Sequence, residues 1–192
     1  GLSRAPSMFI TKSITTTGNW WVFSDGQTSW NYGMNLQSDG ASVDKAGNGS
    51  MSAPTSTVFT TNWTDGLNEP NKDMIAYCFA NTEGYIKSDS YVGNSSDDGT
   101  FVYTGFRPAF VLNKPLVAGN WRQQDIKRSL FNVTQSSLSN NNNAAQDTGA
   151  SVQIDLLSNG FKMRNSQTPW NQTTTFVYLA FAENPFKYAT AR

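Results

Sequence analysis

The sequence contains two segments, about a hundred residues apart, that share one pattern of residue types. Pro6-Ser-Met-Phe-Ile-Thr-Lys12 matches Pro108-Ala-Phe-Val-Leu-Asn-Lys114, so that a proline, three apolar residues, a polar residue and a lysine recur at the same spacing. Further along, Gly18-Asn-Trp20 matches Gly119-Asn-Trp121 after a slip of one residue. The separation is far longer than the period of a solenoid protein. These matches therefore predict two similar halves, each the size of a small domain.

Two further pairs of positions keep the same order and spacing. Ser56 and Phe59 correspond to Ser158 and Phe161, and the apolar run 75–80 corresponds to the run 177–182. We interpret the series as an internal duplication, with a first β repeat over residues 1–89 and a second over residues 90–192. Both runs are continuously apolar, as in strands that are covered on both faces. They are predicted to be equivalent, central strands.

The two halves do not look equally complete. The second half is preceded by two extended segments, 91–93 and 100–103, whereas the first half begins at Gly1 without them. We therefore expect the first half to lack a strand, supplied by upstream sequence of a longer parent chain or by a neighbouring chain, because exposed sheet edges are usually covered. The first strand, 7–11, is expected to be incompletely paired within the chain.

Strand signals dominate the remaining sequence. Val152, Ile154 and Leu156 alternate with polar residues, and Asn159-Gly160 is a strong hairpin turn. Only residues 123–131 are compatible with a short helix. The predicted fold class is all-β: an antiparallel β-sandwich of jelly-roll or lectin-like type, built from two similar halves.

Composition excludes several classes of function. Charged residues are 15% of the chain, and 14 basic residues balance 14 acidic ones, so the electrostatic footprint of a nucleic-acid-binding protein is missing. The absence of histidine excludes Ser-His-Asp and Cys-His nucleophile systems and every imidazole metal site. The lone Cys78 cannot form an internal disulfide and is predicted to be a small buried residue within a strand. No apolar run approaches the length of a membrane span, so membrane insertion is not expected.

Several longer motifs carry a resemblance to a known family. They are Ala76-Tyr-Cys-Phe-Ala80, Glu83-Gly-Tyr85, Ser90-Tyr-Val-Gly-Asn94, Phe101-Val-Tyr-Thr-Gly-Phe-Arg-Pro-Ala-Phe-Val111, Leu157-Ser-Asn-Gly-Phe-Lys162 and Ala180-Phe-Ala-Glu-Asn-Pro-Phe-Lys187. With these motifs the chain resembles, over nearly its whole length, a domain of unknown function that recurs in large structural proteins of marine tailed bacteriophages, often labelled tail-fibre proteins. The resemblance implies a virion structural or host-recognition module with a lectin-like β-sandwich. It brings no established catalytic or binding site.

Loop tryptophans are the candidate ligand-binding residues. Trp63 follows Asn62, and Trp170 precedes Asn171, each just before the long apolar run of its half. Sugars bind to aromatic faces that lie beside amide groups, so these four residues, together with Trp30, are predicted to form a recognition surface. The alternative is that the tryptophans cap the ends of the sandwich.

Other notable residues are assigned to structure. Trp20 and Trp121 recur at equivalent places in the two halves, and we assign both to the core. Glu83, Glu183 and the pair Asp97-Asp98 are the only acids near the recurring motifs, and they are interpreted as solvated turn residues rather than a glycosidase pair. Asp97-Asp98-Gly99 also lacks the ligand spacing of a calcium loop. We expect no metal, no cofactor and no catalytic residue.

Three functions remain open after these exclusions. The leading hypothesis is a non-enzymatic virion appendage module, resembling a tail fibre, that attaches to a bacterial surface through glycan. Its partners would be other virion proteins and copies of itself, for example in a trimer, in the extracellular particle. A structural rival is a head or tail decoration or spacer domain. An enzymatic rival, a polysaccharide depolymerase, is disfavoured by the missing histidine and the scarcity of acids.

Overall fold

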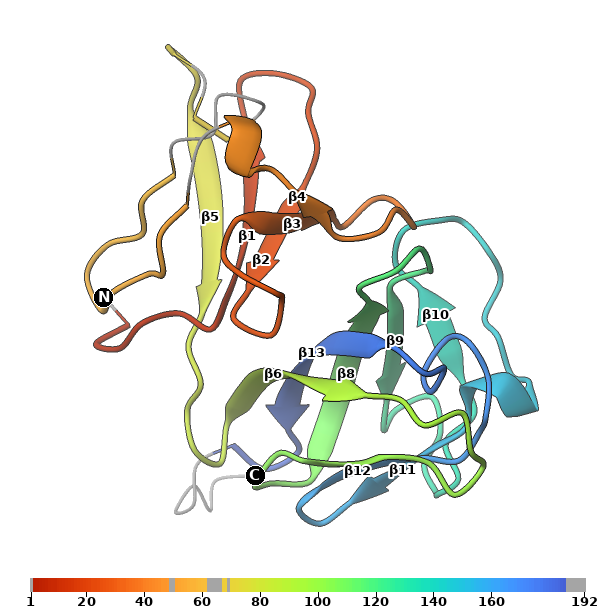
Figure 1. Cartoon of the computed structure of the whole chain (residues 1–192). Helices are drawn as coiled ribbons and strands as arrows, with labels where there is room; N and C mark the ends of the chain where they lie inside the picture. Colours follow the sequence, from red (N-terminus) through yellow and green to blue (C-terminus); the bar gives the residue numbers. More distant parts are fainter. Residues whose placement is uncertain (1, 49–50, 62–66, 69, 186–192) are drawn as a thin grey trace.

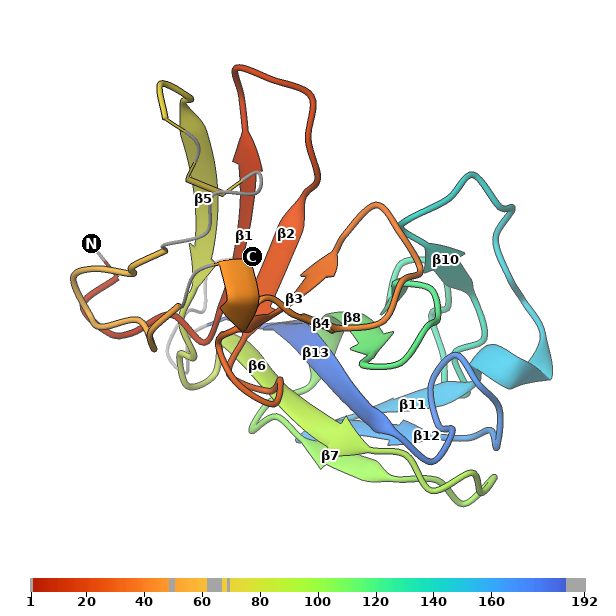
Figure 2. The ribbon, with the colours of Figure 1, turned by 45° about the horizontal axis from the view of Figure 1, so that its top comes forward.

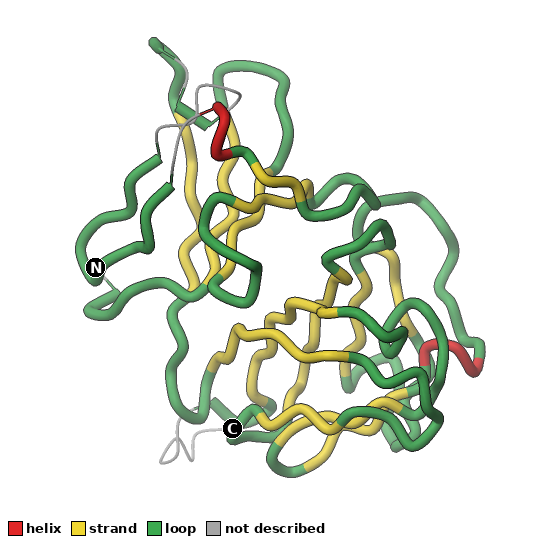
Figure 3. The backbone as a smooth tube through the Cα atoms, viewed as in Figure 1, coloured by secondary structure: helices red, strands yellow, loops and turns green. Residues whose placement is uncertain are grey.

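The protein is described from a computed structural model, which covers residues 2–48, 51–61, 67–68 and 70–185. In these residues the backbone forms antiparallel β-strands and two short 3₁₀ turns (Figures 1 and 3). The elements are β1 Met8–Ser13, β2 Trp21–Ser24, β3 Tyr32–Asn35, β4 Val43–Asp44, η1 Ala46–Asn48, β5 Met74–Phe79, β6 Ile86–Val92, β7 Phe101–Tyr103, β8 Pro108–Pro115, β9 Arg122–Asp125, β10 Ser137–Ser139, η2 Ala150–Val152, β11 Ile154–Leu157, β12 Gly160–Met163 and β13 Thr175–Ala182. The prediction of an all-β, antiparallel fold is confirmed.

The strands form three sheets. The first has the order β4-β3-β2-β1-β5, the second the order β10-β9-β8-β13-β6, and the third the order β11-β12-β7. Each of the first two sheets therefore contains four strands in a corresponding order, β3-β2-β1-β5 in the first and β10-β9-β8-β13 in the second.

Register extends this correspondence to single residues. Met8 of β1 pairs with Phe79 of β5, and Phe110 of β8 pairs with Phe181 of β13, so both strands are offset by 102 residues. Strand β9, by contrast, is offset from β2 by 101 residues, because Met8 pairs with Ser24 and Phe110 pairs with Asp125. The change arises because the first hairpin loop, 14–20, has one residue more than the second, 116–121. The slip in the sequence comparison is this one-residue difference.

The second sheet is the middle layer of the protein (Figure 2). One of its faces packs on the third sheet and forms a β-sandwich. The core of this sandwich includes Val111 and Ala180 from the second sheet and Leu156, Phe161 and Met163 from the third. All five side chains are buried.

The opposite face of the second sheet packs against the first sheet. Leu112 and Val177 lie in one apolar cluster with Met8, Val22 and Met34, so the two halves share a core. The outer face of the first sheet is covered differently. There Met51 and Leu67, from described parts of the segment between η1 and β5, pack against the aromatic side chains of β1 and β2.

Two predictions about the strands of the first half are corrected by the structure. Strand β13 is central and buried as predicted, whereas β5 is an edge strand on which Ala76 and Tyr77 are exposed. The expectation of an incompletely paired first strand is also wrong, since β1 pairs with β2 on one side and β5 on the other. The unpaired edge belongs to β5: β6 flanks β13, and within the described ranges no strand takes that place beside β5.

The short helix predicted over residues 123–131 is wrong. Residues 122–125 form strand β9, which pairs with β8 and β10. The strand ends at Asp125, whose side-chain Oδ1 accepts hydrogen bonds from the backbone amides of Lys127 and Arg128, both at 3.0 Å. An aspartate that bonds the backbone two or three residues on stabilises a turn rather than a helix interior.

Candidate functional site

The predicted recognition surface is not formed as expected. Trp63 and Asn62 lie outside the described residues. Trp170 and Asn171 are both fully buried, so the expectation that they stand exposed in a loop is wrong. Trp170 belongs to the sandwich core, where its carbonyl accepts a hydrogen bond of 2.8 Å from the hydroxyl of Tyr91.

Asn171 organises loops rather than facing solvent. Its Nδ2 amide donates to Asn94 Oδ1 at 2.9 Å and to the carbonyls of Ser96 and Asn165 at 2.7 and 2.8 Å. Trp30 is half-buried and stacks on Phe9, with ring centroids 5.8 Å apart. The two tryptophans therefore pack against different apolar clusters, Trp170 in the sandwich core and Trp30 on the outer face of the first sheet.

The two tryptophans assigned to the core, Trp20 and Trp121, differ in how deeply they are buried. Trp121 is 1% exposed, which confirms its assignment. Trp20, at the equivalent position, is only half-buried, so its assignment to the core is wrong. The reason lies in the arrangement of the layers, because the first half covers Trp121 and no described residue of the second half covers Trp20.

The cover over Trp121 is the segment 34–40, which comprises the last two residues of β3 and the turn after it. Trp121 Nε1 donates to the carbonyl of Asn35 at 2.9 Å, and the amide of Gly119 donates to the carbonyl of Asp39 at 2.7 Å. Leu36 of this segment packs into the cluster between the sheets. Backbone carbonyls and one leucine thus seal this end of the second sheet.

Beneath the same segment lies a buried lysine. Lys114 Nζ donates to three carbonyls, those of Pro115 and Gly40 at 3.0 Å and that of Val117 at 3.2 Å. An ammonium group has three donors, so all of them are used. Burial lowers the pKa of Lys114 to about 8, although the charge of Asp39 opposes this shift.

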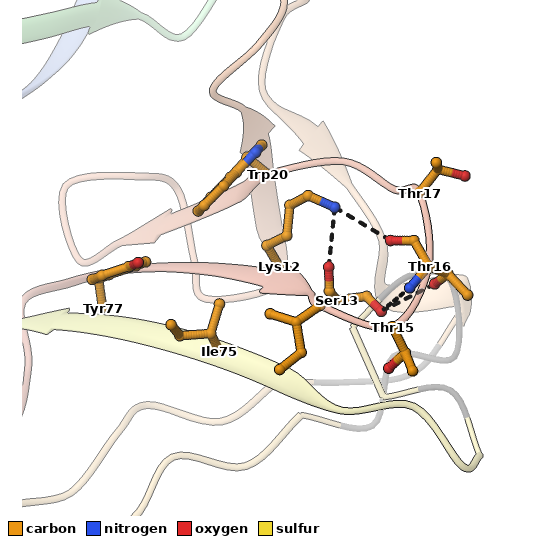
Figure 4. A pocket seen from close by; sticks show the side chains of 9 residues that line it. Lys12, Ser13, Thr15, Thr16, Thr17, Trp20, Ile75 and Tyr77 are labelled. Atoms are coloured by element: carbon orange, nitrogen blue, oxygen red, sulfur yellow. Dashed lines mark hydrogen bonds between the residues drawn. The ribbon is translucent and has the colours of Figure 1, made fainter.

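The first half presents the same constellation without a cover. We call it the Trp20 face, and it comprises Lys12, Ile14, Trp20, Ile75 and Tyr77. It lines a pocket of about 470 Å³ that also includes Ser13 and residues 15–17 (Figure 4). Trp20 and Tyr77 stack with centroids 6.3 Å apart, and Lys12 Nζ lies 6.0 Å from the centre of the Trp20 ring.

Side chains of the Trp20 face are more exposed than their counterparts beneath the covering segment of the other half. Tyr77 is 47% exposed, whereas its counterpart Leu179 is 3% exposed. Ile14 is 66% exposed, whereas its counterpart Leu116 is half-buried in the cluster between the sheets. Lys12 Nζ donates to the carbonyls of Ser13 and Thr16, at 3.0 and 3.4 Å, which leaves one of its three donors free of a described partner.

The Trp20 face can bind but carries no evident reactive group. It offers an aromatic platform, an apolar rim and one cationic donor, which together suit a polar partner with backbone or sugar oxygens. In the described parts of the chain, no three residues among Asp, Glu and Cys are grouped so that they could hold a metal ion. Cys78 is half-buried on β5, and burial raises the pKa of its thiol, so the thiolate is disfavoured.

A cluster of titratable groups lies elsewhere, where the turn after β2 meets β6. A Cβ atom on Gly26 would lie 3.0 Å from the carbonyl carbon of Asp89, so the two backbones are in close contact. Burial raises the pKa of Asp25 from its ordinary value of 3.8 to about 6; the charge of Asp89 adds to the rise, and that of Lys87 opposes it. This cluster joins the two halves.

We expect replacement of Asp25 by asparagine to stabilise the protein at pH 7–8 and to have no effect near pH 3.5. The raised pKa favours folding while the carboxyl is protonated; this contribution is complete below pH 3.8 and is lost as the pH rises through about 6. Asp25 is only partly buried, so screening by solvent should keep the gain within about 1 kcal/mol. Thermal unfolding of both proteins across this pH range measures it. Asp97→Asn, at an exposed loop position, is the control, and an equal pH response in both variants would contradict the assignment.

The sequence carried a signal for the Trp20 face that single residues did not reveal. Position by position, Lys12, Trp20 and Tyr77 correspond to Lys114, Trp121 and Leu179. At one of these positions the first half has Tyr77, with a hydroxyl group, where the second half has the wholly apolar Leu179. Such a change within an otherwise matched set indicates that this position meets water or a polar partner in the first half only.

The fold and the site together define a class: an all-β protein of stacked antiparallel sheets with an open aromatic face on the first sheet. The chain belongs to the family described as Domain of unknown function (DUF7483), which matches residues 1–185. No curated protein and no solved structure matches the chain. Across the described residues, helices of the length and apolar character needed to cross a bilayer do not occur.

Proposed function

We propose that this chain is a non-enzymatic assembly module of a bacteriophage virion appendage such as a tail fibre. The virion setting comes from the resemblance of its motifs to domains of phage structural proteins. The role in assembly is supported by one observation: two equivalent faces occur in the chain, and protein fills one of them while the other is open. A face that is matched to protein in one half is suited to bind protein in the other.

We also propose that the two halves arose by duplication and form a jelly-roll-like pair. The backbone amide of Trp20 donates to Gln37 Oε1, and that of Trp121 donates to Asn141 Oδ1, both at 2.9 Å. In each case the same amide side chain then donates to the asparagine before the tryptophan. Shared side-chain bonds are stronger support than shared strand order, because many unrelated antiparallel sheets have the same order.

Immunoelectron microscopy tests the assignment to an appendage. Antibodies raised against the purified chain should label the fibres or tail of phage particles whose genome encodes it. Antibody absorbed beforehand with the pure chain is the control. Labelling that is confined to infected-cell lysate and absent from purified particles would contradict the proposal.

Attachment to bacterial surface glycan is the second candidate, and one observation favours it. The stacked pair of Trp20 and Tyr77, beside Lys12 and three threonines, has the composition of a sugar-binding platform. Glycan arrays would then show binding by the wild-type chain and its loss in Trp20→Ala. Binding that is equal in the two proteins would exclude this face as the glycan site.

A further inference from the structure

The segment that covers the second half has a counterpart that covers no equivalent face among the residues that the structure describes. The amide of Leu36 donates to the carbonyl of Trp20, and the amide of Asn140 donates to the carbonyl of Trp121, both at 2.9 Å. The segment 138–144 therefore corresponds to the covering segment 34–40. Residues 142–146 are exposed. We call 138–144 the free edge segment.

The Trp20 face retains the bonding groups that the cover satisfies in the other half. Trp121 Nε1, the third donor of Lys114 and the amide of Gly119 bond to the carbonyls of residues 35, 40 and 39. Their counterparts are Trp20 Nε1, the third donor of Lys12 and the amide of Gly18, for which the described structure contains no acceptor. All three acceptors in the filled face are backbone carbonyls. A segment with the same backbone path can therefore supply them whatever its side chains.

We propose that copies of this chain associate head to tail, with the free edge segment of one copy seated on the Trp20 face of the next. The carbonyls at 139, 143 and 144 of the neighbouring copy take the places of those at 35, 39 and 40. This inference rests on the proposed function, since it names the partner of the assembly module. The face and the segment are different surfaces. A pair of copies therefore retains one free Trp20 face and one free edge segment, and each can bind a further copy.

Side-chain differences between the halves fit this partner. In the filled interface Leu36 and Leu179 belong to one apolar cluster. The corresponding residues in the proposed contact are Asn140 and Tyr77, so a polar pair replaces an apolar pair on both sides at once. The loop that borders the Trp20 face is likewise hydroxyl-rich, with threonine at positions 15–17. An asparagine-rich segment matches this more polar face.

The contact is expected to be weak in dilute solution and effective in a particle. A single segment buries much less surface than the roughly 1,600 Å² of a stable protein interface. Copies held close together in an appendage bind at a high effective concentration, which compensates for low affinity. Charge also favours the arrangement, because the ammonium group of Lys12 meets carbonyl oxygens rather than a second cation.

Sedimentation equilibrium of the full chain, from about 10 µM to 1 mM, tests the proposal. We expect the average mass of the wild type to rise with concentration. Trp20→Ala, which removes the aromatic anchor, and Ala144→Arg, which places a cation beside Lys12, should each lower the association constant at least about tenfold. Tyr103→Ala, at a 65% exposed aromatic on β7, and Ala150→Arg are the matched controls and should associate like the wild type.

Mixing the two defective variants tests the polarity of the contact. Trp20→Ala retains a working segment and Ala144→Arg retains a working face, so an equimolar mixture should form dimers and nothing larger. A mixture that stays monomeric while the wild type associates would overturn the head-to-tail arrangement. A wild type that is monomeric throughout would overturn the proposal as a whole, and loss of glycan binding in Trp20→Ala would then favour the second candidate. Antibody labelling of appendages tests the proposed function separately and would survive either result.

Discussion

Replacing Trp121 by alanine should lower the free energy of unfolding by about 3–5 kcal/mol, as is typical when a large buried side chain is truncated. Trp121 is 1% exposed and lies in the core that the two halves share. The change also removes the donor to the Asn35 carbonyl, which leaves that acceptor without its partner under the cover. Urea unfolding at neutral pH, followed by tryptophan fluorescence or circular dichroism, measures the loss.

Trp20→Ala is the matched control, because it removes the same side chain at the equivalent position of the other half. Trp20 is half-buried on an open face, so the expected loss is about 1 kcal/mol or less. Similar losses in the two variants would show that the first half does not cover Trp121 in solution, and the shared core would have to be abandoned.

Replacing Gly160 by alanine should destabilise the sandwich by about 1–3 kcal/mol or more, because the added methyl group has no room. A Cβ atom at this position would collide with the backbone carbonyl of Val102 and approach the ring of Phe101 at 3.0 Å. Both neighbours belong to β7, which pairs with β12 in the third sheet. Backbone cannot move aside as the end of a flexible side chain can, so β7 and β12 must separate.

Gly47→Ala is the control for this prediction, since no heavy atom lies within 4 Å of a Cβ built there. Its stability should equal that of the wild type within about 0.5 kcal/mol. Thermal unfolding of the three proteins decides the comparison. A Gly160→Ala protein as stable as the wild type would mean that β7 does not pair with β12 as described.

Register could be predicted from the sequence, whereas the stacking of the sheets could not. The repeated proline-to-lysine pattern placed Lys12 and Lys114 at equivalent positions, and the structure pairs their strands at matching offsets. These lysines have similar neighbours along the chain, yet one is fully buried and the other is not. What separates them is contact with residues 35–40 of a distant segment. Periodicity describes the faces of a strand and contains no information about which face another sheet will meet.

The candidate site was predicted from local polarity, and this assumption failed at Trp170. Polar neighbours suggested an exposed loop, but Asn171 is buried because its amide finds three oxygen acceptors among the surrounding loops. Buried polar groups are tolerated when they are hydrogen-bonded. Trp20 failed in the opposite direction, since recurrence in both halves was taken as a sign of burial. A repeated residue shares its local geometry with its counterpart, but not the neighbour that covers it.

The core between the first and second sheets determines how this sequence can be exchanged between proteins. Recombination at the boundary near residue 89 would separate Met8 and Met34 from Leu112, Val177 and Trp121. The piece carrying the second half would then expose a broad apolar face, with a lysine that is held only by carbonyls, and such surfaces promote aggregation. A gene that acquired one half alone would therefore encode an aggregation-prone fragment rather than a stably folded domain.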